Sequence, residues 1–173
     1  MPTCPRCALL ALLLALVAFS GCDTNNPGSG LEEVAGTYAA TTLLFDVEAE
    51  EVTDADVLGK LRNRRATVEI FADGQMTISF EPLGGQRQLV TGSARASSRT
   101  VTISARTDTD EERMALLLLP PEVSFSRDEL APNELMASLL LVNVDLEAFD
   151  PAAYTGLQSV RGRLEVELER VDD

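Results

Sequence analysis

The segment Arg163–Glu169, with the sequence RLEVELE, alternates charged and apolar residues without interruption. Successive side chains of a β-strand point to opposite faces of a sheet, so this period of two indicates one buried and one solvated face. We expect Leu164, Val166 and Leu168 to face a core. A half-buried strand of this kind is typical of an antiparallel sheet.

The same alternation occurs on both sides of two turn sequences. Two alternating runs within 68–81 flank Asp73 and Gly74, a pair of residues that favours a tight hairpin turn. A second hairpin is predicted to join Gln88–Ala96 to Thr100–Ala105, with Val101 and Ile103 on the inward face. Two antiparallel hairpins are therefore expected in the middle of the chain.

The remaining elements follow from shorter patterns. Thr53–Leu61 is predicted as a short helix, because Thr53 suits the N-cap and acidic residues occupy the first turn. Leu135–Val142 fits a helix in its first half and a strand in its second. The further predicted strands are Thr37–Phe45, Met114–Leu119, Val123–Ser126 and Leu140–Leu146.

About eight short strands and one short helix predict an all-β fold, an antiparallel up-and-down β-barrel. Closing the sheet removes the exposed strand edges that an open sheet would leave. A β-sandwich is the alternative architecture. Residues 31–173 are expected to form this domain alone, because about 150 residues suffice for one core but not for two.

The N-terminus has the composition of an export signal. Arg6 supplies a positive charge, and Ala8–Phe19 is an uninterrupted apolar run of 12 residues. A helix that crosses a membrane needs about 20 such residues, so a transmembrane span is not predicted here. Residues 1–21 are therefore interpreted as a signal peptide.

The stretch Phe19-Ser20-Gly21-Cys22 resembles the lipobox of bacterial lipoproteins, with Phe19 where that family most often has Leu. The resemblance implies cleavage between Gly21 and Cys22, a lipid on Cys22, and a membrane as the partner of that lipid. Residues 22–30, CDTNNPGSG, would then be the lipidated cysteine and a flexible tether. The alternative is cleavage by an ordinary signal peptidase after Ser20, which would release a soluble protein.

Composition excludes several function classes. The formal net charge is −14, so nucleic-acid binding is not expected. The chain has no histidine, and Cys4 and Cys7 precede the predicted cleavage site. Without an imidazole or a free mature thiol we predict no enzyme, no cofactor and no metal site. The acidic run Asp108–Glu112 lacks the spacing of a calcium loop, because Arg113 stands where glycine is needed.

The start of the domain, Val34-Ala35-Gly36-Thr37-Tyr38, together with the hairpin turn and the last strand, resembles bacterial lipocalin-like lipoproteins. In lipocalins the opening motif is Gly-x-Trp, and its Trp closes the barrel floor beneath a basic residue of the last strand. Gly36 and Tyr38 match that motif with Tyr in place of Trp. Arg163 or Arg170 would supply the basic partner.

This resemblance implies a barrel that binds a small apolar ligand, in a protein of the bacterial cell envelope, on the periplasmic or extracellular face. The alternative is an interaction or scaffold lipoprotein with a filled barrel and an envelope protein as partner. Met114–Leu119 and Leu135–Val142 favour that alternative, because both are apolar on two faces. The residues expected to line the ligand cavity are Met76, Ile78, Phe80, Val101, Ile103, Leu164, Val166 and Leu168.

Overall fold

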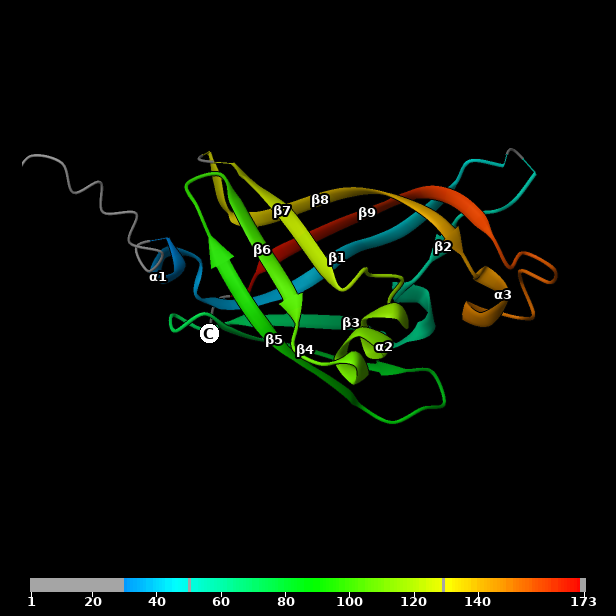
Figure 1. Cartoon of the computed structure of the whole chain (residues 1–173), viewed down its shortest axis with the longest axis horizontal. Coiled ribbons are helices and arrows are strands. Elements are labelled where there is room, and N and C mark those ends of the chain that lie inside the picture. The colour runs from blue at the N-terminus through cyan, green and yellow to red at the C-terminus, as the bar shows by residue number, and fades with distance from the viewer. Residues whose placement is uncertain (1–29, 50, 129, 172–173) are drawn as a thin grey trace, which may run out of the picture.

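The alternating segments form eight long strands, each paired antiparallel with the next of the eight, and the last pairs with the first (Figure 1). The computed structural model describes residues 30–171 apart from 50 and 129. Its sheet closes through β1–β9, which confirms the predicted eight-stranded up-and-down barrel and replaces the sandwich alternative. The two-residue β2 extends the sheet beside β1. The strands are β1 (Gly36–Val47), β2 (Ala55–Asp56), β3 (Leu61–Ile70), β4 (Gln75–Pro82), β5 (Gln88–Ala96), β6 (Thr100–Ala105), β7 (Glu122–Asp128), β8 (Ala131–Val144) and β9 (Val160–Arg170).

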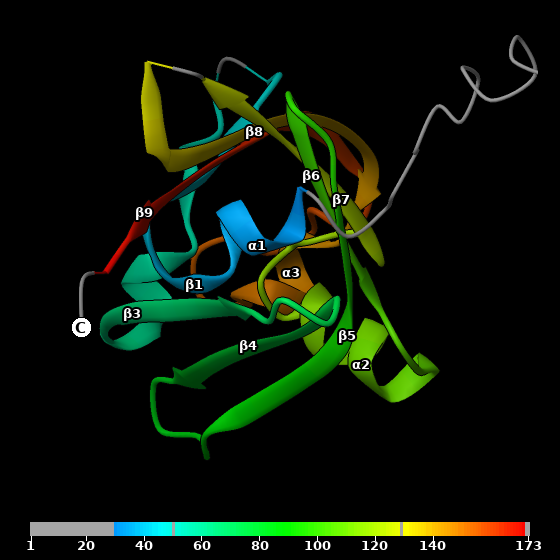
Figure 2. The same ribbon diagram turned by 90° about the vertical axis from the view of Figure 1, so that its left-hand side faces the viewer.

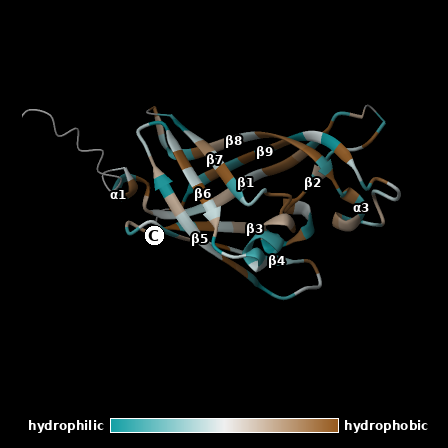
Figure 3. Ribbon diagram, viewed as in Figure 1, coloured by the Kyte–Doolittle hydropathy of each residue, from teal (hydrophilic) through white to brown (hydrophobic). Residues whose placement is uncertain are grey.

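Strand faces follow the sequence pattern. Along β9, Leu164, Val166 and Leu168 are buried, whereas the glutamates between them are more exposed. Apolar and polar residues also alternate along the ribbons of β4 and β6 (Figure 3). The inward side chains of all eight barrel strands form one apolar core, which includes Tyr38, Phe45 and Phe125.

One end of the barrel is closed by α1 (Leu31–Val34), which lies across the ring of strands (Figure 2). Leu31 and Val34 are buried against the core, and the helix is followed at once by β1. We call this the closed end. The predicted signal peptide, the lipidation site at Cys22 and the tether up to residue 29 lie outside the described residues.

The opposite end, which we call the mouth, is where neighbouring strands separate. β7 pairs with β8 only from Ser126↔Met136 to Asp128↔Ala131, while β8 continues along β9 as far as Val144. β1 and β3 likewise pair over only four residues at the closed end. Three short elements lie at this end: α2 (Asp108–Ala115), α3 (Leu146–Phe149) and the 3-10 turn η1 (Leu58–Lys60) (Figure 1). α2 packs against β5 and β6, and η1 packs against β1 and β3.

The predicted strand at Met114–Leu119 is wrong. Met114 and Ala115 end helix α2, and the remaining leucines form a turn in which Leu118 has a φ of 56°. The helix begins at the N-cap Thr107, whose side chain accepts the amide of Asp110. Met114 and Leu117, one helical turn apart, enter the core. The apolar run therefore follows a helical spacing rather than a strand spacing.

Two other expectations need correction. Thr53–Leu61 forms β2 and η1 instead of a helix, because Asp56 uses its carboxylate to accept the amide of Gly59 and so turns the chain early. Leu135–Val142, which fitted either element, lies entirely in β8. The strand predicted at Leu140–Leu146 ends at Val144, since Leu146 begins α3.

Candidate functional site

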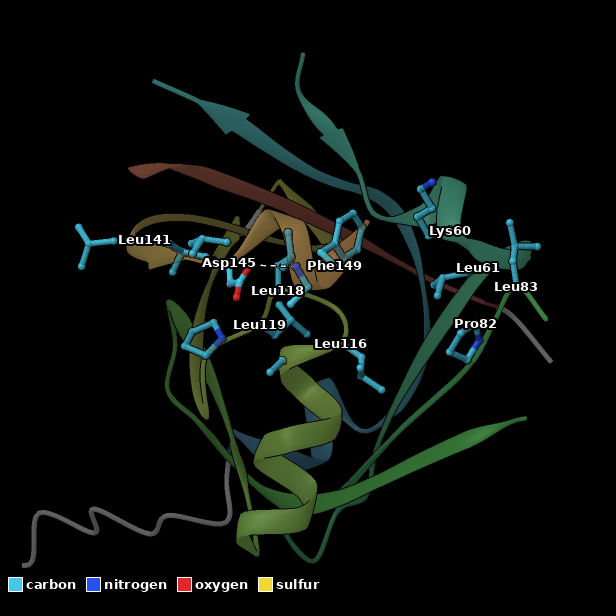
Figure 4. A pocket seen from close by; sticks show the side chains of 15 residues that line it. Lys60, Leu61, Pro82, Leu83, Leu116, Leu118, Leu119, Leu141, Asp145 and Phe149 are labelled. Atoms are coloured by element: carbon cyan, nitrogen blue, oxygen red, sulfur yellow. Dashed lines mark hydrogen bonds between the residues drawn. The ribbon is translucent and has the colours of Figure 1, made fainter. Parts of the chain in front are cut away.

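The mouth holds an apolar pocket with a volume of about 570 Å³ (Figure 4). Its walls come from four separate parts of the chain: the start of β3, the end of β4, the turn after α2, and the end of β8 with α3. Most of the lining side chains are aliphatic, and Phe149 contributes a ring. The lining residues are Lys60, Leu61, Pro82, Leu83, Ala115, Leu116, Leu118, Leu119, Pro120, Leu141, Val142, Val144, Asp145, Ala148 and Phe149.

Hydrogen bonds from side chains hold α2 beside the mouth. β6 ends before it has covered the whole of β5, and α2 takes its place along that edge. The carboxylate of Asp110 accepts the amide of Thr91 at 2.9 Å, and Arg113 donates to the carbonyl of Leu89 at 3.0 Å. The side chains of Asp110 and Arg113 thus bond backbone groups of β5 that β6 does not reach. They hold in place the turn 116–119 that follows α2, which we call the leucine turn.

Asp110 is buried and its charge is well compensated. Burial by itself would raise the pKa of this carboxyl group, but hydrogen bonds from Thr107 and Thr91 and the charge of Arg113 outweigh it. The pKa therefore lies below its ordinary value of 3.8. Asp110 stays ionised at neutral pH and keeps α2 in place.

The polar groups of the pocket sit at its rim. Asp145 caps α3 by accepting the amide of Ala148 at 2.8 Å. Lys60, the single lysine of the chain, forms an ion pair with Asp150 directly after α3. The hydrogen bond and charge of Lys60 lower the pKa of the Asp150 carboxyl group. Lys60 and Asp145 are therefore the two charged residues of a pocket whose other lining residues are apolar, and both are exposed.

The residues expected to line a ligand cavity lie inside the barrel rather than at its mouth. Each of the eight is at most 3% exposed and belongs to the common core. None of them lines the mouth pocket. The pocket was missed by sequence analysis because its walls meet only through long-range strand pairing. One available signal was Thr107 with Asp110 three residues later, a helix start that places the following leucines on a turn.

The floor residues meet at the closed end. Arg170 lies over the Tyr38 ring, 5.9 Å from its centre, and also donates to the carbonyl of Ala35. The Tyr38 hydroxyl donates to the carbonyl of Val34 at 2.9 Å. Gly36, with a φ of 153°, leaves the room that the guanidinium occupies, since a Cβ there would lie 2.8 Å from Arg170 Nε. Burial raises the pKa of the Tyr38 phenol above 10.0.

Arg163, the other candidate for the basic partner of Tyr38, lies on the outer face of β9. It donates to the hydroxyl of Ser138 at 3.0 Å. The alternation of β9 explains the difference, because Arg163 and Arg170 differ by an odd number of residues and so belong to opposite faces. Arg170 shares the inward face of β9 with Leu168 and is the register partner of Tyr38 on β1, which places its guanidinium group at the closed end.

Within the described ranges, no helix is long and apolar enough to cross a membrane. The same part of the chain contains no cluster of three or more Cys, Asp or Glu residues arranged to hold a metal ion. The sequence matches no protein-family model and no curated protein.

Proposed function

We propose that this protein is a lipoprotein of the bacterial cell envelope, anchored through Cys22, whose barrel binds a small apolar ligand in the mouth pocket. The observation that carries the binding proposal is the pocket of about 570 Å³, whose lining is aliphatic apart from Phe149 and the two charged residues Lys60 and Asp145. Small-molecule sites in proteins have volumes of roughly 300–1,000 Å³ and this same division between apolar walls and few polar groups.

The closed end supports a lipocalin-like interpretation of the barrel. Gly36, Tyr38 and Arg170 form the aromatic and basic floor that the resemblance implied. A closed floor leaves the opposite end as the entrance for a ligand. The mouth pocket lies at that end.

The binding proposal is tested by native mass spectrometry of residues 22–173 with Cys22→Ser, which include every described residue of the barrel and its core. We expect extra mass of one small apolar molecule per chain that disappears after denaturation and organic extraction. Leu116→Asp should abolish it, because Leu116 lines the pocket. Leu89→Asp is the matched control: Leu89 is 48% exposed and Leu116 is 49%, but Leu89 does not line the pocket. A protein without extra mass that takes up no offered lipid would contradict the proposal.

The anchor is tested separately by metabolic labelling of the full chain with radioactive palmitate in a bacterial host. Label on the wild-type chain and on Cys7→Ala, but not on Cys22→Ala, is the expected result. Equal label on all three chains, or on none, would contradict lipidation at Cys22.

A second candidate function is that of an envelope interaction protein. It is favoured by the outer face of β8, where Met136 and Leu140 are 40% and 50% exposed. Solvent-facing strand positions are ordinarily polar. Under this reading Leu140→Asp would abolish capture of an envelope protein, while Leu116→Asp would leave it unchanged.

A further inference from the structure

Basic residues are concentrated on one side of the mouth. The chain has 14 basic residues against 28 acidic ones, yet five of the basic residues lie at the start of β3 and just before β5. These are Lys60, Arg62, Arg64, Arg65 and Arg87. Three of them pair with carboxylates, Lys60 with Asp150, Arg62 with Glu81 and Arg64 with Asp56. Arg65 and Arg87 leave a local excess of positive charge in a protein of net charge −14.

An irregular stretch of β3 brings these basic side chains together. The pairing of β3 with β4 shifts between Leu61 and Ala66, and Asn63 and Arg64 have φ values of 55° and 52°. Such left-handed conformations are unfavourable for residues other than glycine and recur at functional sites. As a result, the four residues 62–65 are all exposed instead of alternating between the two faces.

A polar groove of about 320 Å³ lies beside this bulge and is lined by outward polar side chains together with the inward residue Phe80. Arg62 and Arg65 come from β3, and Arg87 comes from the β4–β5 loop. Hydroxyl groups of Thr67 and Ser79 complete the polar lining. The groove is lined by Arg62, Asn63, Arg65, Thr67, Ser79, Phe80, Glu81 and Arg87.

The groove carries more positive charge than its own carboxylate neutralises. Arg62 pairs with Glu81 at 2.6 Å. Across the residues the structure describes, Arg65 and Arg87 make no salt bridge, and Arg87 donates only to the hydroxyl of Ser79 at 2.8 Å. Three guanidinium groups therefore face one carboxylate.

The groove and the mouth pocket share a rim. Leu61 pairs with Pro82, and both line the pocket. The next residues along the two strands, Arg62 and Glu81, line the groove. Since consecutive Cα atoms are about 3.8 Å apart and side chains alternate between faces, the two cavities lie on the inner and outer sides of the same strand ends.

We propose that the ligand of the mouth pocket is an anionic amphiphile, with its acyl chain in the pocket and an acidic head group of phosphate size in the groove, held by Arg62, Arg65 and Arg87. This proposal rests on the proposed function of the pocket. Guanidinium groups bind phosphate oxygens through paired, charge-assisted hydrogen bonds. The distant carboxylates do not prevent this, because charges more than about 8 Å away are largely screened at physiological ionic strength.

The test compares decanoyl glycerophosphate with monodecanoylglycerol, which have the same chain and differ in head-group charge. Each is titrated calorimetrically into the full chain, expressed with its own N-terminal segment and held in phosphatidylcholine nanodiscs, with empty discs as the blank. We expect the phosphate-headed compound to bind about tenfold more tightly, since exposed charge pairs each contribute modestly. The preference should shrink as salt is added.

The matched variants are Arg65→Gln with Arg87→Gln in the groove, and Arg95→Gln with Arg99→Gln towards the closed end of β5. Both pairs remove two positive charges. The groove pair should bring the two affinities to within about twofold of each other, while the control pair keeps the preference seen in the wild type. Glycerol phosphate without a chain should bind far more weakly than its decanoyl form.

The outcomes separate the two proposals. Equal affinity of both amphiphiles for the wild type, or a preference that survives in the groove pair, overturns the head-group assignment and leaves an apolar pocket. Glycerol phosphate binding as tightly as its decanoyl form also overturns it, because the groove would then be a free-anion site. Failure of both amphiphiles to bind would contradict the proposed function itself.

Discussion

The two ends of the barrel differ in how completely their apolar side chains are buried. At the closed end, Tyr38 is fully buried, its hydroxyl has an acceptor and Arg170 lies over its ring. At the mouth, Leu116, Leu83 and Val142 remain between 49% and 61% exposed although all three line the pocket. Exposed apolar walls cost free energy in water, and a ligand would recover it.

The two ends also differ in backbone strain. The described residues other than glycine that have a positive φ are Asn63, Arg64, Leu118 and Asn143, and all lie towards the mouth. Leu118 lines the pocket, and Asn63 lines the adjoining groove. Strained conformations of this kind persist where the surrounding structure imposes them. The closed end therefore supplies stability, and the mouth supplies the shape of a site.

The largest effect on the free energy of unfolding is expected from Tyr38→Ala, at the closed end. Loss of a buried aromatic ring leaves a cavity and should lower the free energy of unfolding by about 4 kcal/mol. Tyr38→Phe, the control, removes only the hydrogen bond to Val34 and should cost about 1 kcal/mol. Urea unfolding measures both. A Tyr38→Ala protein as stable as Tyr38→Phe would mean that the floor does not hold the barrel together.

Asp110→Ala is expected to have the second largest effect. It removes a buried charged acceptor of the Thr91 and Thr107 hydrogen bonds and should cost about 2–3 kcal/mol of unfolding free energy. The leucine turn after α2 should lose protection from amide hydrogen exchange, while the amides beside Tyr38 keep theirs. Equal loss of protection at both ends would show that the mouth and floor do not behave separately.

Asp110 also predicts how the mouth responds to acid. Its pKa is lower in the folded protein than its ordinary value of 3.8, so its ionised form stabilises the fold. That stabilisation is complete above about pH 5 and is lost as the pH falls below 4 through the folded-state pKa. Hydrogen exchange at pH 3 should show the mouth opening before the floor. Asp110→Asn should be less sensitive to acid than the wild type, and equal sensitivity would count against this role.

A smaller effect separates the two arginines of the last strand. Arg170→Gln removes the cation above Tyr38 and should cost about 1.5 kcal/mol. Arg163→Gln changes an exposed contact with Ser138 and should cost less than about 0.5 kcal/mol. Thermal unfolding of the two variants side by side measures the difference. Equal destabilisation would contradict the assignment of Arg170 as the floor residue.

The smallest stability effect is expected at the mouth. Leu116→Ala should cost less than about 1 kcal/mol, because this side chain is 49% exposed and little apolar area leaves water on folding. The same variant should nevertheless weaken binding of an apolar ligand several-fold in a titration. A variant that loses more than 2 kcal/mol of stability without any effect on binding would indicate that the pocket is part of the core.

Some parts of the fold could be predicted from the sequence and others could not. The inward faces of β4, β6 and β9 follow directly from alternation, and Asp73 with Gly74 fixes the β3–β4 turn through local hydrogen bonds. Gly36 and Tyr38 were expected to meet a basic residue of the last strand through the resemblance of the opening motif, and not through a local pattern. The strand prediction for Met114–Leu119 was wrong because a short apolar run fits either a strand or a helix. Only the N-cap at Thr107 distinguishes the two.

The sequence by itself determined which side chains face inward and how neighbouring strands join. These features depend on interactions between residues close along the chain, which alternation and turn chemistry specify. Only the tertiary structure decided that β7 separates from β8 and that a pocket and a basic groove share the rim at Leu61 and Pro82. Those features depend on the register between distant strands and on where each pairing ends, and no local pattern encodes either.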